Sequence, residues 1–269
     1  MYHKEKMKIV ISDKVKKDLF VAIFQTLKNC TNIISINFEV ERMYIQGMDK
    51  SHVCLFDVIL LSGWFHEYDV DQTVVISFDS NTFFTIINSK QESNDIIIKH
   101  NKNDKDDEDN LFVELVSQEH SKGEFNKFFK IPLIDYDYDL MGIPSTEYDA
   151  EFSIHSKKIC EIVSQMMIFG ADIQINCSEE KIDLVTNGVT GEMRVNIPIQ
   201  DLTQYSIVEG EEIQLSYSLS YIHKMCLTNK LSSEIDFFIS GESPMKLKYD
   251  LGNDSSMEFY IAPKVIDTD

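Results

Sequence analysis

The stretch KIVISDKVKKDLFVAIFQTLKN (Lys8–Asn29) contains the pattern from which the fold follows. Its first residues, Lys8–Ser12, are rich in β-branched side chains and predict a strand. Asp13 then stands where a helix N-cap is expected, and apolar residues recur after it at helical spacing. The positions predicted to share one helix face are Val15, Leu19, Ala22, Ile23 and Leu27. The stretch therefore predicts a strand that leads directly into an amphipathic helix.

The same pattern recurs along the chain. Helices are predicted over 13–29, 80–90, 155–169 and 218–229, each preceded by a short strand at 8–12, 73–78, 150–154 or 212–217. In the third helix, the predicted apolar face is formed by Ile159, Ile162, Val163, Met166 and Met167. Three strands follow each helix, predicted at 33–40, 43–46, 53–61; 95–99, 111–116, 127–133; 172–177, 181–186, 192–199; and 234–240, 244–250, 257–262. One strand–helix–three-strand unit thus occurs four times, which predicts an α+β fold of two similar halves.

Length and composition agree with two domains. The 269 residues allow two domains of about 130 residues each, and 43% of them are apolar. No apolar run of membrane-spanning length is present, and the N-terminal MYHKEKMKIVIS lacks the apolar core of a signal peptide. The five cysteines are scattered without CxxC spacing, which favours free thiols in a reducing compartment.

An extended segment divides the halves. IPLIDYDYDLMGIPSTEYD (Ile131–Asp149) alternates Asp and Tyr and then reaches Gly-Ile-Pro, which predicts an exposed connector. We therefore expect an N-terminal domain at 1–132, a connector at 133–148 and a C-terminal domain at 149–269. The polar run HNKNDKDDEDN (His100–Asn110) predicts a solvated hairpin loop.

The charge of the chain gives arguments both against and for nucleic-acid binding. The formal charge of −20 argues against phosphate binding, but an acidic protein can carry one basic face. Here Lys14, Lys16, Lys17, Lys157, Lys158, His223 and Lys224 all fall on predicted helices, whereas acidic residues concentrate in loops. If the helices line one surface, that surface is more basic than the rest. Ordinary solvated helix faces explain the same residues equally well.

Candidate catalytic and metal sites are weak. Asp135, Asp137 and Asp139 share one face of an extended segment, which favours a linker over a cation site. His52 and Cys54 fall on one predicted strand face near Asp49, but no second His/Cys pair completes a metal site. No phosphate-binding, zinc-protease or nucleophile-elbow motif is present.

Three motifs then give a resemblance. MDKSHVCLF (Met48–Phe56), LMGIPSTEY (Leu140–Tyr148) and YIAPKV (Tyr260–Val265), together with the fourfold repeat and the acidic balance, resemble proliferating cell nuclear antigen (PCNA), the eukaryotic-type DNA sliding clamp. The resemblance spans nearly the whole chain. It implies a non-enzymatic homotrimeric ring with sheets outside and helices lining a hole for duplex DNA, with no catalytic residue, metal or cofactor. It also implies an ATP-dependent clamp loader, and polymerase and other replication or repair factors that dock through a PIP-box-like peptide.

The resemblance carries three residue sets onto this chain. The partner-peptide set is Met48, His52, Val53, Leu55, Met141, Ile143, Pro144, Pro244, Tyr260, Ala262, Pro263 and Val265. The subunit-interface set is Phe129, Ile131, Leu133, Met166, Met193, Val195 and Ile197, on two edge strands and the third helix. The DNA-facing set is the group of helical basic residues named above, in which Lys16 and Lys17 match the family's basic pair on helix one and the others are expected to compensate for family positions that are not basic here.

The chain also departs from the family pattern. The family's basic positions on helices three and four are occupied by Glu161, Ser164 and Ser220, which implies loose, salt-sensitive DNA contact. The position of its ubiquitin-acceptor lysine holds Glu179, with Lys181 two residues on. Such departures indicate a divergent member from a protist or a large DNA virus, acting in the nucleus or in a viral replication compartment.

Three alternatives to the homotrimeric clamp stay open from sequence. The chain could be a clamp-fold interaction scaffold that does not encircle DNA, or one subunit of a heterotrimeric ring. A carboxylate–metal nuclease using the Asp-rich segments is the third. Retention on circular but not linear DNA, mass in solution and Mg²⁺-dependent hydrolysis would separate them.

Overall fold

The computed structural model describes residues 6–101, 108–117, 125–137, 139–143, 145–226 and 230–264. The chain divides into two compact units, each of which contains two helices and antiparallel strands. Unit 1 comprises Met1–Lys50, Asp57–Met141 and Leu251–Ser256; unit 2 comprises Ser51–Phe56, Gly142–Asp250 and Met257–Asp269.

Unit 1 contains the first half of the repeat. Its strands follow the orders β5-β1-β7-β8-β9 and β4-β3-β2-β6. The elements are β1 (Lys6–Ile11), α1 (Lys14–Cys30), β2 (Ile33–Phe38), β3 (Arg42–Met48), β4 (Cys54–Leu61, of which Asp57 onward belongs to unit 1), a 3₁₀ turn (Ser62–Trp64), β5 (Glu67–Val70), β6 (Val74–Asp79), α2 (Ser80–Asn88), β7 (Asn94–Asn101), β8 (Asn110–Ser117) and β9 (Lys127–Pro132).

Unit 2 contains the second half. Its strand orders, β14-β10-β16-β17-β18 and β13-β12-β11-β15, match those of unit 1 strand for strand. The elements are β10 (Ala150–His155), α3 (Ser156–Met166), β11 (Asp172–Cys177), β12 (Lys181–Gly188), β13 (Gly191–Pro198), a 3₁₀ turn (Ile199–Asp201), β14 (Gln204–Ile207), β15 (Ile213–Ser218), α4 (Leu219–Cys226), β16 (Glu234–Ile239), β17 (Met245–Gly252) and β18 (Ser255–Ile261, mostly in unit 2).

The predicted α+β repeat is confirmed, and it contains one strand per half that the sequence pattern missed. β5 pairs with β1, and its counterpart β14 pairs with β10. Each is only 4 residues long and follows a 3₁₀ turn. Their sequences, EYDV and QYSI, offer too few apolar alternations for a periodicity signal.

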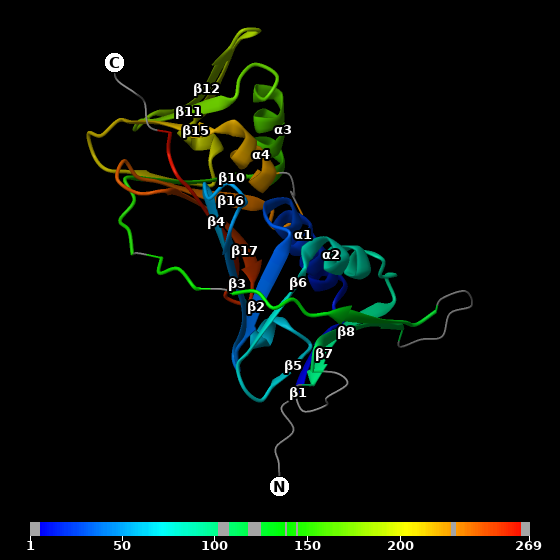
Figure 1. Ribbon diagram of the computed structural model, residues 1–269. Helices are drawn as coiled ribbons and strands as arrows, with labels where there is room; N and C mark the ends of the chain where they lie inside the picture. Colours follow the sequence, from blue (N-terminus) through cyan, green and yellow to red (C-terminus); the bar gives the residue numbers. More distant parts are fainter. Residues whose placement is uncertain are drawn as a thin grey trace. The chain divides into compact units, whose positions relative to one another are not determined.

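The helices of unit 1 pack around aromatic side chains. Phe20 and Phe24 of α1 lie 6.4 and 4.6 Å from the ring of Phe83 on α2, and the helices lie side by side (Figure 1). The buried stripe of α1 is therefore centred on Phe20 and Phe24. The prediction that Val15 shares this stripe is wrong: its side chain, in the first turn of the helix, is 71% exposed.

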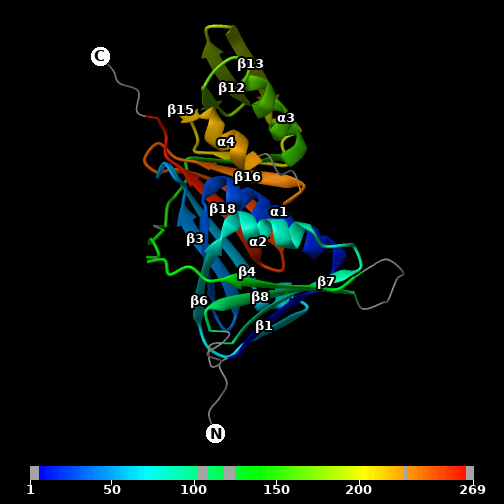
Figure 2. The same ribbon diagram turned by 45° about the vertical axis from the view of Figure 1, so that its right-hand side comes forward.

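The helices of unit 2 are shorter and pack through aliphatic and sulfur-containing side chains. Val163 and Met166 of α3 and Ile222 and Met225 of α4 are buried, and α3 contacts α4 (Figure 2). α3 ends at Met166, so Met167 lies beyond it and is 42% exposed. The sequence prediction that Met167 completes the buried face is therefore wrong.

Side-chain caps begin both helices of unit 1. Asp13 accepts a hydrogen bond from the Lys16 amide at 2.9 Å, and Asp79 accepts one from the Thr82 amide at 2.7 Å. α3 follows His155, which makes no side-chain capping bond. Within the described residues, the helices are too short or too polar to cross a membrane.

Candidate functional site

The first motif stands at the start of β4, in unit 2. Val53 accepts a backbone hydrogen bond from the Ala262 amide at 3.4 Å, which joins the first motif to the C-terminal motif. His52 is exposed and has a φ of 55°, so it turns the chain ahead of the strand. Leu55 is half-buried on β4. Two of the three predicted motifs thus meet through backbone pairing.

Tyr260, the aromatic residue of the C-terminal motif, is hydrogen-bonded to a side chain of its own strand, β18. The Tyr260 hydroxyl donates to Glu258 Oε2 at 2.6 Å, and Glu258 also lies 3.8 Å from Lys248. Tyr260 and Pro263 are half-buried, whereas Ala262 and Pro244 are exposed. These partly exposed apolar groups could contact a peptide. Pro144 and Val265, also predicted for this set, lie outside the described residues.

The connector residues of the set fall in both units. Met141 belongs to unit 1 and is 40% exposed, while its backbone is hydrogen-bonded to the side chain of Gln46. Met48 is half-buried at the end of β3 in unit 1, and Ile143 is half-buried in unit 2. Sequence reasoning did not select Gln46, because a single glutamine in a strand carries no motif.

The would-be metal ligands of the first motif do not form a site. Cys54 is fully buried and Asp49 is 6% exposed, whereas His52 is exposed. His52 precedes β4, which begins at Cys54, so the two residues do not share a strand face as predicted. Among the residues that the structure describes, no group of three or more His, Cys, Asp or Glu side chains could hold a metal ion.

One member of the DNA-facing set is buried, which corrects the prediction. Lys17 is 3% exposed, and its Nζ donates to the backbone carbonyls of Glu92 at 2.8 Å and Asn94 at 2.7 Å. Burial lowers the pKa of the Lys17 ammonium, an effect that nearby Asp95 partly offsets. Lys17 therefore ties α1 to the chain ahead of β7 and is not available to DNA.

The other basic residues of the DNA-facing set differ in how far their side chains are exposed to solvent. Lys16 is half-buried, and its Nζ donates to the Trp64 carbonyl at 2.7 Å. Lys14 is exposed and paired with Glu92, which raises the pKa of Lys14. Lys157, Lys158 and Lys224 are exposed, and His223 is half-buried. The exposed cations thus come mainly from α3 and α4.

Three members of the subunit-interface set are core residues. Met166 is fully buried, Ile131 is 2% exposed and Ile197 is 7% exposed within the single chain. Their side chains therefore pack within their own unit, and Ile131 and Ile197 could take part in a subunit contact only through the backbone of the edge strands β9 and β13. Phe129, Leu133, Met193 and Val195 remain half-buried.

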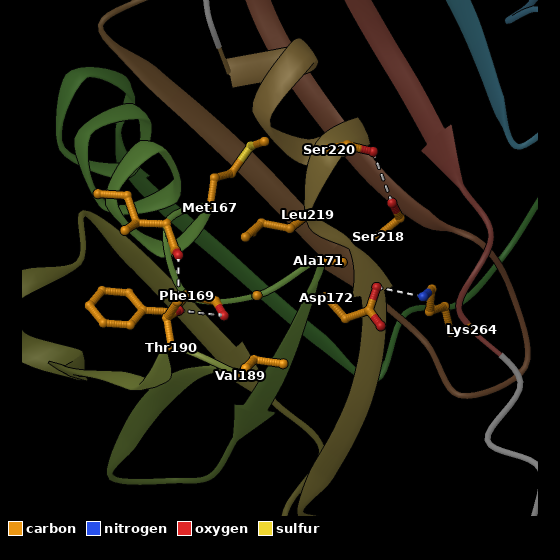
Figure 3. Close-up of a pocket in the computed structure, with 12 residues that line it drawn as sticks. Met167, Phe169, Ala171, Asp172, Val189, Thr190, Ser218, Leu219, Ser220 and Lys264 are labelled. Atoms are coloured by element: carbon orange, nitrogen blue, oxygen red, sulfur yellow. Dashed lines mark hydrogen bonds and ion pairs between the residues drawn. The ribbon is translucent and has the colours of Figure 1, made fainter.

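Exposed apolar residues of unit 2 follow the end of α3 and occupy the turn between β12 and β13. Ile168 is 69% exposed after the end of α3, and Val189 is fully exposed in the turn between β12 and β13. They flank a hollow of about 540 Å³, shown in Figure 3, with Met167 on one side, Val189 on the other and Lys264 paired to Asp172 at 2.5 Å. Phe128 of β9, in unit 1, is likewise 68% exposed.

Two glycines bring these segments of unit 2 together. A Cβ on Gly188 would lie 1.9 Å from the Phe169 carbonyl oxygen, and one on Gly170 would lie 2.6 Å from the Asn187 carbonyl oxygen. Backbone can approach this closely only where side chains are absent. The end of α3 is therefore fixed against the β12–β13 turn, and both present apolar side chains.

The fold defines a class of protein, the two-domain clamps built from a repeated strand–helix unit. The model of the proliferating cell nuclear antigen N-terminal domain matches residues 13–140, and that of the C-terminal domain matches residues 142–264. The chain therefore belongs to the PCNA family of sliding clamps.

Known proteins agree with that assignment. Proliferating cell nuclear antigen 2 of Plasmodium falciparum is 23% identical over 262 residues, covering 94% of this chain and 98% of the relative. Proliferating cell nuclear antigen of Chaetomium thermophilum is 26% identical over 228 residues, covering 83% of this chain and 85% of the relative. The crystal structure of PCNA from Thermococcus kodakaraensis matches with a TM-score of 0.83 at 21% identity, over 96% of this chain and all of that one, which shows the shared fold.

Proposed function

We propose that this protein is a DNA sliding clamp that assembles as a homotrimeric ring around duplex DNA and tethers polymerase and other factors. The observation that carries the proposal is the repetition itself. Both units have the same strand orders, and each packs a pair of helices against its strands. Three such chains would supply six equivalent units, a number suited to a closed ring.

Edge strands support assembly. β9 and β13 end their strand orders, and exposed apolar residues accompany both. An unpaired edge is a template for pairing with another chain, and pairing β9 of one copy with β13 of the next would cover both of these edges. The revised contact set is Phe128, Phe129, Leu133, Met167, Ile168, Val189, Met193 and Val195. A ring closed in this way would need an ATP-dependent loader to open it.

Tethering supplies the function without any reaction of the clamp's own. A polymerase held by a short peptide on the ring stays at a high local concentration near its template. The partly exposed residues Tyr260, Ala262 and Pro263 of unit 2 support such a peptide site, because apolar and aromatic anchors fit a rigid apolar surface. No step in this mechanism requires a metal, a cofactor or a catalytic side chain.

Retention on DNA tests encirclement. The protein is loaded onto a nicked circular plasmid with an ATP-dependent clamp loader, and half of the sample is then linearised. We expect retention on the circle and loss from the linear form, because topology and not contact holds the ring. Equal retention on both forms would refute encirclement. Lys157→Glu with Lys158→Glu should mainly shorten the residence time at low salt.

Mass in solution tests the assembly surface separately. Ile168→Asp places a charge on the exposed apolar edge and should shift the sedimenting species from trimer toward monomer. Val208→Asp is the matched control, since Val208 is also an exposed apolar residue of unit 2, at 48%, but lies in the loop after β14. If both variants sediment as the wild type does, the assigned edge is wrong.

The second candidate is a heterotrimer subunit or a clamp-fold scaffold that does not encircle DNA. It is favoured by the loss of Lys17 from the DNA-facing set and by the exposed Glu161, Ser164 and Ser220 on α3 and α4. A monomer at high protein concentration, with trimers forming only on mixing with other clamp chains, would select it.

A further inference from the structure

A group of buried polar side chains on β3 and β4 of unit 1 includes Gln46, which binds the backbone of Met141. Tyr44 is 9% exposed, Gln46 2% and Asp57 5%. Tyr44 and Gln46 are two residues apart on β3 and therefore share a face of the strand, and Asp57 stands on the neighbouring β4. We refer to these three residues as the Gln46 network.

The Gln46 network ends on the backbone of the connector. The Tyr44 hydroxyl donates to Asp57 Oδ2 at 2.6 Å, and Gln46 Nε2 lies 3.4 Å from the same oxygen. Gln46 Nε2 also donates to the Met141 carbonyl at 2.9 Å, and the Met141 amide donates back to Gln46 Oε1 at 2.7 Å. The side-chain amide thus pairs with Met141 as a peptide group of a neighbouring strand would.

The orientation of the Gln46 amide is determined by its neighbours. Its nitrogen faces two acceptors, the Asp57 carboxylate and the Met141 carbonyl, while its oxygen faces one donor, the Met141 amide. Turning the amide over would oppose acceptor to acceptor and donor to donor. Asp57 therefore holds Gln46 in the single orientation that matches Met141.

This pairing fixes one register of the connector. If the connector shifted by one residue, the buried Gln46 amide would lose both of its backbone partners. Leaving a buried donor and acceptor unpaired costs more free energy than a solvent-exposed hydrogen bond contributes. With the backbone held, the Met141 side chain stays 40% exposed and Leu140 51% exposed. The network therefore presents these two side chains to solvent at a defined place.

The second half of the repeat has no counterpart of Gln46. Ile36 of β2 pairs with Ile45, as Ile175 of β11 pairs with Leu184, so Gln46 corresponds to Val185. A valine side chain can neither donate nor accept a hydrogen bond. The glutamine is therefore specific to the half that carries the connector.

We propose that Gln46, oriented by Asp57 and Tyr44, is a positioning residue that holds the connector in register and so sets the affinity of partner peptides. The inference rests on the proposed function for its link to peptides, and the network's hold on the connector can be measured without them.

The experiment combines two measurements on the full-length protein. Hydrogen–deuterium exchange at the Met141 amide reports the hold on the connector, and the affinity of a fluorescent synthetic PIP-box peptide reports its consequence. Gln46→Ala should speed exchange at Met141 by roughly tenfold, because both hydrogen bonds are lost. It should weaken peptide binding by roughly 3- to 10-fold through lost preorganisation. Gln214→Ala, at an exposed glutamine of β15, should change neither.

A second variant covers the case in which Gln46→Ala does not fold. Gln46→Met keeps the approximate volume of the side chain but loses both hydrogen bonds to Met141, so faster exchange and weaker peptide binding are expected again. Wild-type exchange in both variants would overturn the proposal. Faster exchange with unchanged affinity would overturn the link to partner binding.

Failure of the proposed function gives a different result. If the wild-type protein does not bind the peptide at all, the tethering role fails, and the affinity part of this proposal fails with it. Faster exchange in Gln46→Ala would still support the network's hold on the connector.

Discussion

The two units share a strand order but fill the space between helices and strands with different side chains. In unit 1, Phe20, Phe24, Trp64 and Phe83 form a chain of ring contacts with centroids 4.6 to 6.4 Å apart. In unit 2, the helices meet through aliphatic residues and methionines, and α3 has 11 residues where α1 has 17. The comparison teaches that this topology requires apolar residues at the right period and not particular side chains.

The units also differ in how their equivalent faces are used. β3 and β4 bury a polar network that binds the connector, whereas β13, the counterpart of β4, ends its strand order and exposes Glu192, Arg194 and Asn196. In unit 2, Asp183 of β12 pairs with Lys181 at 2.9 Å and accepts from Asn196 at 2.8 Å. One half therefore covers this face with its own chain, and the other leaves an edge available for assembly.

The largest effect is expected from the aromatic contacts of unit 1. Phe20→Ala should reduce the free energy of unfolding by about 3–5 kcal/mol, because a buried ring and its contacts are lost. Met225→Leu in unit 2 should cost less than about 1.5 kcal/mol, because the two side chains are similar in volume. Urea unfolding followed by Trp64 fluorescence checks both. A loss from Met225→Leu as large as that from Phe20→Ala would mean that the packing of unit 2 is the more sensitive to side-chain shape.

The next effect is expected from Lys17, a buried lysine of unit 1. Lys17→Met should cost about 1–3 kcal/mol, because two backbone carbonyls lose their donor in a buried place. Lys158→Met, at an exposed position of α3, should stay within about 0.5 kcal/mol of the wild type. Urea midpoints at pH 7 measure the difference. A loss below that of Lys158→Met would show that the two hydrogen bonds contribute nothing.

Lys17 also predicts a pH dependence. Because burial lowers its pKa in the folded state below 10.5, the unfolded chain binds more protons between the folded pKa and 10.5. The contribution of Lys17 to stability should therefore rise as pH increases through that window. The cost of Lys17→Met should be larger at pH 10 than at pH 7. A cost that shrinks with pH would contradict the assignment.

The smallest effect concerns helix caps, which also differ between the units. Asp79→Ala should cost about 1 kcal/mol, and His155→Asp should gain about 0.5–1 kcal/mol by giving α3 the acceptor that it lacks. Thermal unfolding of the two variants measures the expected loss and the expected gain in stability. If His155→Asp destabilises the protein, the loop before α3 does not permit capping.

The contribution of the Asp79 cap to stability should depend on pH. The hydrogen bond from the Thr82 side chain, followed by that from its amide, lowers the pKa of the Asp79 carboxyl below 3.8 in the folded state. Its contribution is therefore full above pH 3.8 and is lost as pH falls through the lower folded pKa. The stability gap between wild type and Asp79→Ala should narrow in that acid range. A constant gap would contradict the capping role.

Much of the fold and part of the site could be predicted from the sequence. Helical spacing after short β-branched runs predicted the four helices that the structure describes. The MDKSHVCLF and YIAPKV motifs were assigned to one peptide site by resemblance, and the structure joins them through the hydrogen bond from Ala262 to Val53. β5 and β14 were not predicted, because 4 residues are too few for an alternation of apolar and polar side chains to be recognised. Lys17 was misassigned because a helical lysine is usually solvated, and its two carbonyl partners are about 75 residues away in sequence.

The sequence by itself determined the period, order and repetition of the elements, because these depend on local spacing of apolar side chains and on turn residues. Only the tertiary structure decided which member of a pattern is buried. It placed Met166 in the core and Ile168 outside because the helix ends between them, and it paired Gln46 with Met141 across 95 residues of chain. Burial and long-range hydrogen bonding depend on what the chain brings together, and local sequence does not encode those partners.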